Sequence, residues 1–167
     1  MTTLGALAAS PPDDLHHVLY ALGPFVDRYP ELAAAFEVRV LPLSGRVKGA
    51  RVLAEQTWLD LRARRDRIDA IHHLGGTMPL VGGPPAALSI HDLQPFDHPE
   101  RFHPLKRAWL SVAVPRAVDR ARVVVVPSEW VRGTVIDRFG VEPDRVVCVP
   151  HGLPPLDEGT PIDVLRE

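Results

Sequence analysis

The sequence of 167 residues has a single cysteine, no long apolar run and no excess of positive charge. One cysteine, Cys148, excludes an internal disulfide framework and a metal site built from several cysteines, and its apolar surroundings indicate a core thiol. No apolar stretch reaches membrane-spanning length, and no basic flank precedes the first apolar residues as in a secretory signal. The formal net charge of -2 argues against a dedicated nucleic-acid binder. We therefore expect a cytoplasmic protein, with contact to a membrane surface left open.

Several motifs that identify a particular chemistry are also missing. There is no G-x-G-x-x-G or Walker pattern for phosphate, no G-x-S-x-G around a nucleophilic serine, and no H-E-x-x-H or H-x-H-x-D spacing for a metal. The eight histidines leave a metal-dependent hydrolase as the least favoured alternative. Its candidate ligands are His72, His73, His91, His98, His103 and Asp92. Because adjacent histidines direct their side chains differently, we expect no metal.

What the sequence does contain is an alternation of short apolar segments with longer helical ones. Strands are predicted at 38–43, 68–73, 86–91, 122–126 and 145–149. Helices are predicted from Asp13 or Asp14 to about residue 26, at 50–66, at 100–120, and from Ser128 to Phe139. This alternation predicts an α/β fold with a doubly wound parallel sheet. We expect a loose arm over residues 1–12, one domain over 13–153 and a linker over 154–167.

The most informative segment is the buried strand predicted at 86–91, because it ends at His91 and is followed directly by Asp92. In an open parallel sheet, ligands collect outside the carboxyl ends of the strands. The other predicted strands are also followed by glycine or polar residues, which brings together Gly75, Gly76, Thr77, Ser128, Glu129, His151 and Gly152. Four loops distant in sequence should then line one crevice, where the helix start at Ser128 suits an anionic ligand.

Each candidate also has a simpler structural interpretation. A hydrogen bond from His91 to a loop carbonyl explains that residue as well as catalysis does. Asp92 is better explained as a turn cap, and Ser128 as a helix cap. Gly75 and Gly76 can serve only to allow positive φ angles.

A run of arginines follows the helix predicted at 50–66. Its members are Arg62, Arg64, Arg65 and Arg67. The favoured interpretation is a solvated helix end that the helix dipole stabilises. The alternative is a patch for anionic lipid or phosphate.

Three ordered motifs resemble segments of family 4 glycosyltransferases. The first is LSIHDLQP at 88–95, followed by HPERF at 98–102 and KR at 106–107; the second is VVVVPSEWV at 123–131. The third runs from FGV at 139–141 to RVVCVPHG at 145–152, and HHLGGTMP at 72–79 is similar to some bacterial members. The family usually has asparagine at the position of His151. The resemblance covers roughly residues 68–153.

This resemblance implies one Rossmann-like half of a GT-B fold, the half that mostly binds acceptor. It implies a retaining, nucleotide-sugar-dependent transfer of a hexose such as mannose to a glycan or lipid-linked acceptor, without a metal or other cofactor. His91 would be catalytic, close to the transferred sugar and the leaving phosphate. The substrate-binding residues would be Gly75, Gly76, Thr77, Asp92, Gln94, Ser128, His151 and Gly152.

Two departures from the family shape the expected activity. We expect the donor-binding domain to be missing from this chain, and we expect residues 2–10 to be a poor substitute for the strand that normally opens the fold. We therefore expect an incomplete half that is inactive without a donor-binding domain in cis or trans. A non-catalytic module that binds sugar or a partner, or a degenerate fragment, stays an alternative.

Overall fold

The structure, a computed structural model, describes residues 2–41, 43 and 48–152. Its contacts group the described residues into two compact units, one with residues 2–41, 43, 151 and 152 and the other with residues 48–150. Domain boundaries near residues 12 and 153 stay a prediction. The linker predicted at 154–167 lies outside the described residues.

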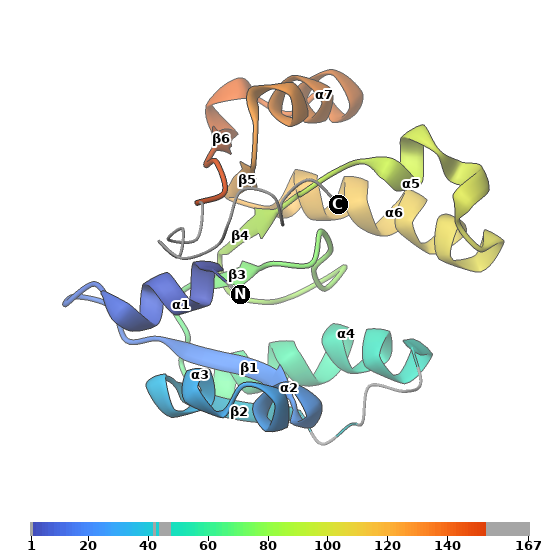
Figure 1. Ribbon diagram of the computed structural model, residues 1–167. Coiled ribbons are helices and arrows are strands. Elements are labelled where there is room, and N and C mark those ends of the chain that lie inside the picture. The colour runs from blue at the N-terminus through green and yellow to red at the C-terminus, as the bar shows by residue number, and fades with distance from the viewer. Residues whose placement is uncertain (1, 42, 44–47, 153–167) are drawn as a thin grey trace, which may run out of the picture. The chain divides into compact units, whose positions relative to one another are not determined.

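The first unit is built on a pair of parallel strands, β1 (Val18–Leu22) and β2 (Glu37–Leu41). Two short helices connect them, α2 (Gly23–Arg28) and α3 (Pro30–Ala35), and the preceding helix α1 (Thr2–Ala9) contacts α3 (Figure 1). Proline stands in the first turn of α2 and of α3, where its missing N–H costs no helical hydrogen bond.

The structure corrects three expectations for this unit. Residues 2–9 form helix α1 and not a loose arm. Residues 18–22 form strand β1, so the helix predicted from Asp13 or Asp14 to residue 26 is wrong. The five consecutive apolar residues of β1 fit a strand as well as a helix face, and pairing with β2 decided between the two. Because β1 is followed by Gly23 and a helix, the expected lack of an opening strand is also wrong.

The second unit holds a four-stranded parallel sheet in the order β3-β4-β5-β6. Its strands are β3 (Ile71–His73), β4 (Ala86–Ser89), β5 (Val123–Val126) and β6 (Val146–Cys148). Its helices are α4 (Lys48–Arg65), α5 (Gln94–Asp97), α6 (Pro104–Arg120) and α7 (Glu129–Phe139), with 3-10 turns η1 (Pro99–Arg101) and η2 (Pro143–Arg145). This arrangement confirms the predicted Rossmann-like α/β class with parallel strands.

The predicted elements of this unit exist, with shorter strands than expected. Strand β3 begins at Ile71 and not at residue 68, because the N–H of Ile68 donates to Ala63 O and closes the end of α4. The predicted cap of α7 is confirmed: Ser128 Oγ accepts from the N–H of Val131 at 3.3 Å. Gly140 ends that helix at φ 62°, as predicted.

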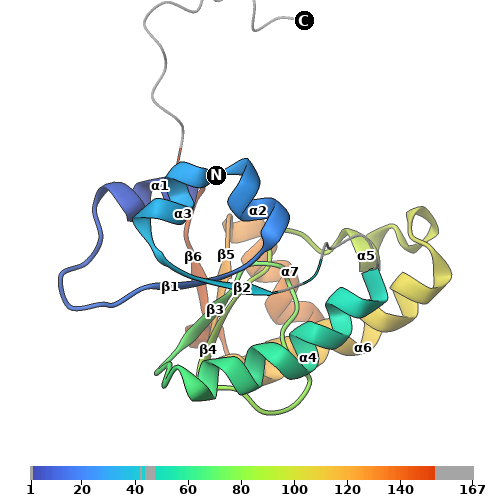
Figure 2. The ribbon, with the colours of Figure 1, turned by 90° about the horizontal axis from the view of Figure 1, so that it is seen from below.

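The core of this unit lies on one side of the sheet. Leu88, Val124, Val126 and Val146 alternate with more exposed residues along their strands and are almost fully buried. Helices α6 and α7 cover them, as Figure 2 shows, through Val114, Ala117, Val118, Val131 and Val135. Since this packing fixes the strands, it also fixes the loops at their carboxyl ends.

Candidate functional site

The four strands of the second unit are parallel, so their carboxyl ends lie at one edge of the sheet. The ladder continues past the strand ends: the N–H of Ile90 donates to Val125 O, and the N–H of Val149 donates to Val126 O. The loops after β3, β4 and β5 therefore lie at this edge, as the sequence predicted for Gly75, His91 and Ser128.

His91 lies two residues after the end of β4, and its side chain is exposed to solvent. Its Nε2 donates to the carbonyl oxygen of Leu74, in the loop after β3, at 3.2 Å. Because a carbonyl only accepts, the hydrogen atom of this contact belongs to Nε2, which fixes the tautomer of the neutral ring. The loop-carbonyl contact foreseen for His91 is thus present, and it leaves the imidazole at the edge of the sheet.

A second imidazole joins the same two strands. His72 Nε2 and Ser89 Oγ share a hydrogen bond of 2.9 Å. Burial, and to a smaller extent the neighbouring His91, lower the pKa of His72. Two histidines and one serine thus gather where β3 and β4 end.

His73 faces the opposite side of the sheet from His72. Burial, with smaller effects from His72 and Arg120, lowers its pKa to about 4. His73 is therefore neutral at pH 7 and belongs to the packed side of the unit. The two adjacent histidines do point in different directions, as the sequence predicted.

The other candidate residues mostly hold their own loops in shape. Asp92 Oδ1 accepts from the N–H of Gln94 at 3.0 Å, which is the predicted turn cap. Gly76 has φ 74°, a conformation that favours glycine. A side chain built at Gly75 or Gly76 would meet no atom within 4 Å, so this loop is open to an approaching ligand. Substrate binding by these residues and by Thr77 stays a prediction.

The last two candidates, His151 and Gly152, are exposed and group with the first unit by their contacts. Their part in the site stays a prediction. Within the described part of the chain, no group of three or more His, Cys, Asp or Glu side chains could hold a metal ion. The six residues considered as metal ligands are thus not assembled into such a group there.

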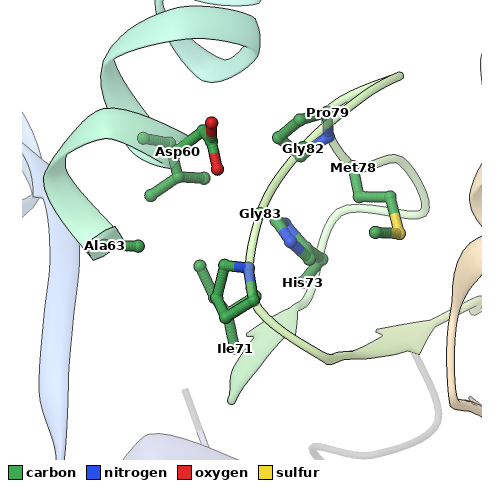
Figure 3. Close-up of a pocket in the computed structure, with 10 residues that line it drawn as sticks. Asp60, Ala63, Ile71, His73, Met78, Pro79, Gly82 and Gly83 are labelled. Atoms are coloured by element: carbon green, nitrogen blue, oxygen red, sulfur yellow. The ribbon is translucent and has the colours of Figure 1, made fainter. Parts of the chain in front are cut away.

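A small pocket lies between α4 and the loop that joins β3 to β4 (Figure 3). It encloses about 10 Å³, room for roughly one water molecule. Asp60, Ala63 and His73 line it together with Met78 and Gly82. A pocket of this size belongs to the packing of the loop and cannot hold a sugar.

A larger groove of about 410 Å³ lies beside α5 and α6. Its lining is mostly apolar, with one guanidinium and one hydroxyl: Pro95, Phe96, Pro99, Arg107, Ala108, Leu110 and Ser111. Helix α5 begins three residues after His91, so the groove is built by the segment that follows the histidine loop.

A comparison with protein families identifies the family of the chain. The model described as Glycosyltransferase Family 4 matches residues 8–155. The chain belongs to glycosyltransferase family 4. No curated protein compared with the chain matches it. Among the described residues of this family 4 protein, no helix is both long and apolar enough to cross a membrane.

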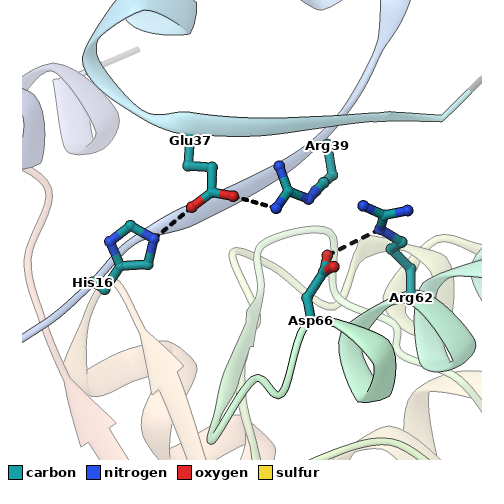
Figure 4. A network of polar contacts seen from close by, with 5 residues as sticks. All are labelled: His16, Glu37, Arg39, Arg62 and Asp66. Atoms are coloured by element: carbon teal, nitrogen blue, oxygen red, sulfur yellow. Dashed lines mark hydrogen bonds and ion pairs between the residues drawn. The ribbon is translucent and has the colours of Figure 1, made fainter.

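The arginines at the end of α4 behave as the favoured interpretation expected. Arg62 contacts Asp66 at 3.0 Å (Figure 4), and Arg64 contacts Asp60 at 3.1 Å. Ion pairs four residues apart neutralise part of the positive charge on the helix end. The first unit has its own polar network, in which Glu37 accepts from His16 at 2.6 Å and from Arg39 (Figure 4).

The sequence alone did not reveal one part of this candidate site, the contact between His72 and Ser89. It indicated a role for His72 only as a metal ligand and did not single out Ser89. The available signal was a polar residue in an otherwise apolar buried strand, because a buried hydroxyl needs a partner. The identity of that partner depends on strand register, which the sequence does not display.

Proposed function

We propose that this chain is the acceptor-side domain of a retaining, nucleotide-sugar-dependent glycosyltransferase that transfers a hexose, such as mannose, to a glycan or lipid-linked acceptor. Membership of family 4 supports the reaction class. The observation that carries the proposal is His91, an exposed imidazole held by Leu74 O at the carboxyl edge of the parallel sheet. Ligands of such sheets bind at this edge.

In this proposal His91 stabilises the charge that develops as the donor phosphate leaves. A protonated imidazole can donate from Nδ1 while Nε2 stays bound to Leu74 O. A ring that is already oriented needs little reorganisation during the reaction, which makes its interaction with the transition state more effective. The transfer needs no metal or other cofactor in this scheme.

The surrounding residues would bind the substrates. The start of α7 at Ser128 presents backbone N–H groups and the positive end of the helix dipole. Gly75 and Gly76 leave space for a sugar, and Thr77, Asp92, Gln94, His151 and Gly152 complete the proposed set. Because transfer requires donor and acceptor to be held together, we propose that the chain acts with a donor-binding domain and is inactive alone.

The groove beside α5 and α6 supports a lipid-linked acceptor over a purely polar glycan. Apolar walls at Phe96 and Leu110 suit a hydrocarbon chain, and the guanidinium of Arg107 suits a phosphate. Leu105 on the same helix is 75% exposed. We accordingly propose a cytoplasmic protein that contacts the membrane surface where such an acceptor resides.

The test joins the chain to a family 4 donor-binding domain and measures sugar transfer from GDP-mannose and UDP-glucose to lipid-linked and free glycan acceptors. We expect transfer by the joined protein and none by the chain alone. His91→Ala should lower kcat by about 100-fold or more, the usual loss for one group that stabilises transition-state charge. His98→Ala, another exposed histidine, is the matched control and should retain activity.

Binding of a sugar without transfer would favour the second candidate, a non-catalytic sugar-binding module. Trp130, at the start of α7, is 71% exposed and offers an aromatic face on which a sugar ring can stack. That candidate predicts that Trp130→Ala abolishes binding to a hexose while His91→Ala does not. The transferase proposal predicts instead that His91→Ala lowers turnover more than Trp130→Ala does.

A further inference from the structure

Two side-chain hydrogen bonds tie the same pair of strand ends together. His72 of β3 bonds to Ser89, the last residue of β4, at 2.9 Å. Two residues further along each chain segment, His91 donates to Leu74 O at 3.2 Å. The bond between His72 and Ser89 lies closer to the paired part of the strands than the bond between His91 and Leu74. The register of β3 on β4 brings His72 and Ser89 together.

The hydrogen bond between His72 and Ser89 matters because Ser89 is buried. This serine is 6% exposed and is the only buried polar side chain among the described residues. A buried hydroxyl without a hydrogen-bond partner destabilises the fold. The hydrogen bond between Ser89 and the imidazole of His72 therefore holds the end of β4 in position. His91 follows Ser89 by two residues and depends on the same backbone.

We propose that His72 is a positioning residue of the transfer site, which holds the end of β4 through Ser89 and thereby orients the ring of His91. The inference rests on the proposed role of His91. Burial and the neighbouring His91 lower the pKa of His72, so His72 stays neutral near pH 7 and places no positive charge next to the ring of His91. A neutral His72 leaves His91 as the imidazole that meets the developing negative charge.

The primary test uses the full chain and NMR of its histidine rings. The nitrogen shifts of His91 report how much of the neutral ring carries its proton on Nε2, the nitrogen that donates to Leu74 O. Ser89→Ala and His72→Phe should each reduce the Nε2–H share and broaden or move the His91 ring signals. His72→Gln, whose amide can still bond to Ser89, should restore them in large part.

The matched control is His73→Gln on the same strand. His73 faces the other side of the sheet, so this change tests general destabilisation without touching Ser89. It should leave the His91 signals in place. If His72→Phe does not fold, Ser89→Ala removes only the hydroxyl and decides the matter alone. Unchanged His91 signals in a folded Ser89→Ala variant would overturn the proposal.

A second measurement separates this proposal from the function itself. In the joined enzyme, His72→Phe should lower kcat by up to about 100-fold with KM nearly unchanged, as expected for a misplaced catalytic group. No transfer by the wild-type joined enzyme, together with moved His91 signals in the variants, would refute the function and keep the positioning role. Normal kcat in His72→Phe would refute the positioning role and keep the function.

Discussion

At the scale of single residues, three histidines in a short space have three different environments. His91 is exposed and bonded to a carbonyl, His72 is bonded to a buried hydroxyl, and His73 is packed against the core side of the sheet. Composition alone made them equivalent candidates for a metal. Their burial and partners give each a separate role.

His73 makes the stability of the protein depend on pH. Its pKa is 6.5 in the unfolded chain and about 4 when folded, because burial disfavours the charged ring. The unfolded chain therefore binds more protons in this window, so stability is complete above pH 6.5 and is lost as the pH falls towards 4. The difference between the two values corresponds to about 3 kcal/mol.

Urea unfolding at pH 7 and pH 4 measures this effect. In the wild type, the free energy of unfolding should fall between these pH values by about 3 kcal/mol more than in His73→Gln, whose side chain does not titrate. The same loss in both proteins would show that His73 is not responsible.

At the scale of elements, local sequence signals determine the limits of some helices and strands, and packing between segments determines others. Helix α7 has a serine cap at its start and a left-handed glycine at its end, so its limits follow from the sequence. Strand β1 has no such signals, and its conformation depends on pairing with β2. Helix α7, with a signal at each end, was therefore predicted correctly to the residue.

The cap of α7 can be tested directly. Ser128→Ala removes the oxygen that accepts from the N–H of Val131 and should lower the free energy of unfolding by about 1 kcal/mol. Ser128→Asp keeps an acceptor and should cost little. Thermal and urea unfolding of the two variants give the comparison, and equal stability of Ser128→Ala and wild type would show that the cap is not needed.

At the scale of the whole molecule, the contacts of the chain divide it into two units. The core cluster runs from Met78 to Val146 and lies entirely within the second unit. The candidate residues from Gly75 to Ser128 lie in that unit too. The family 4 match spans both units, from residue 8 to residue 155.

A self-contained core predicts that residues 45–150 fold when expressed alone. Leu88 and Val124 are fully buried against other members of the same unit, so removal of the first unit leaves this core complete. The fragment should show helical circular dichroism and one cooperative thermal transition. Within it, Leu88→Ala should cost about 2–5 kcal/mol and can serve as the destabilised reference. A fragment without a cooperative transition would contradict the prediction.

The sequence by itself determined the strands rich in β-branched residues, the capped helix α7 and the placement of His91 in the loop that follows a buried strand. These follow from side-chain chemistry over a few neighbouring residues. The tertiary structure alone decided that residues 18–22 form a strand and that His72 meets Ser89, 17 residues away. Both outcomes depend on which strand lies beside which and in what register, and that choice is made by packing between segments distant in the chain.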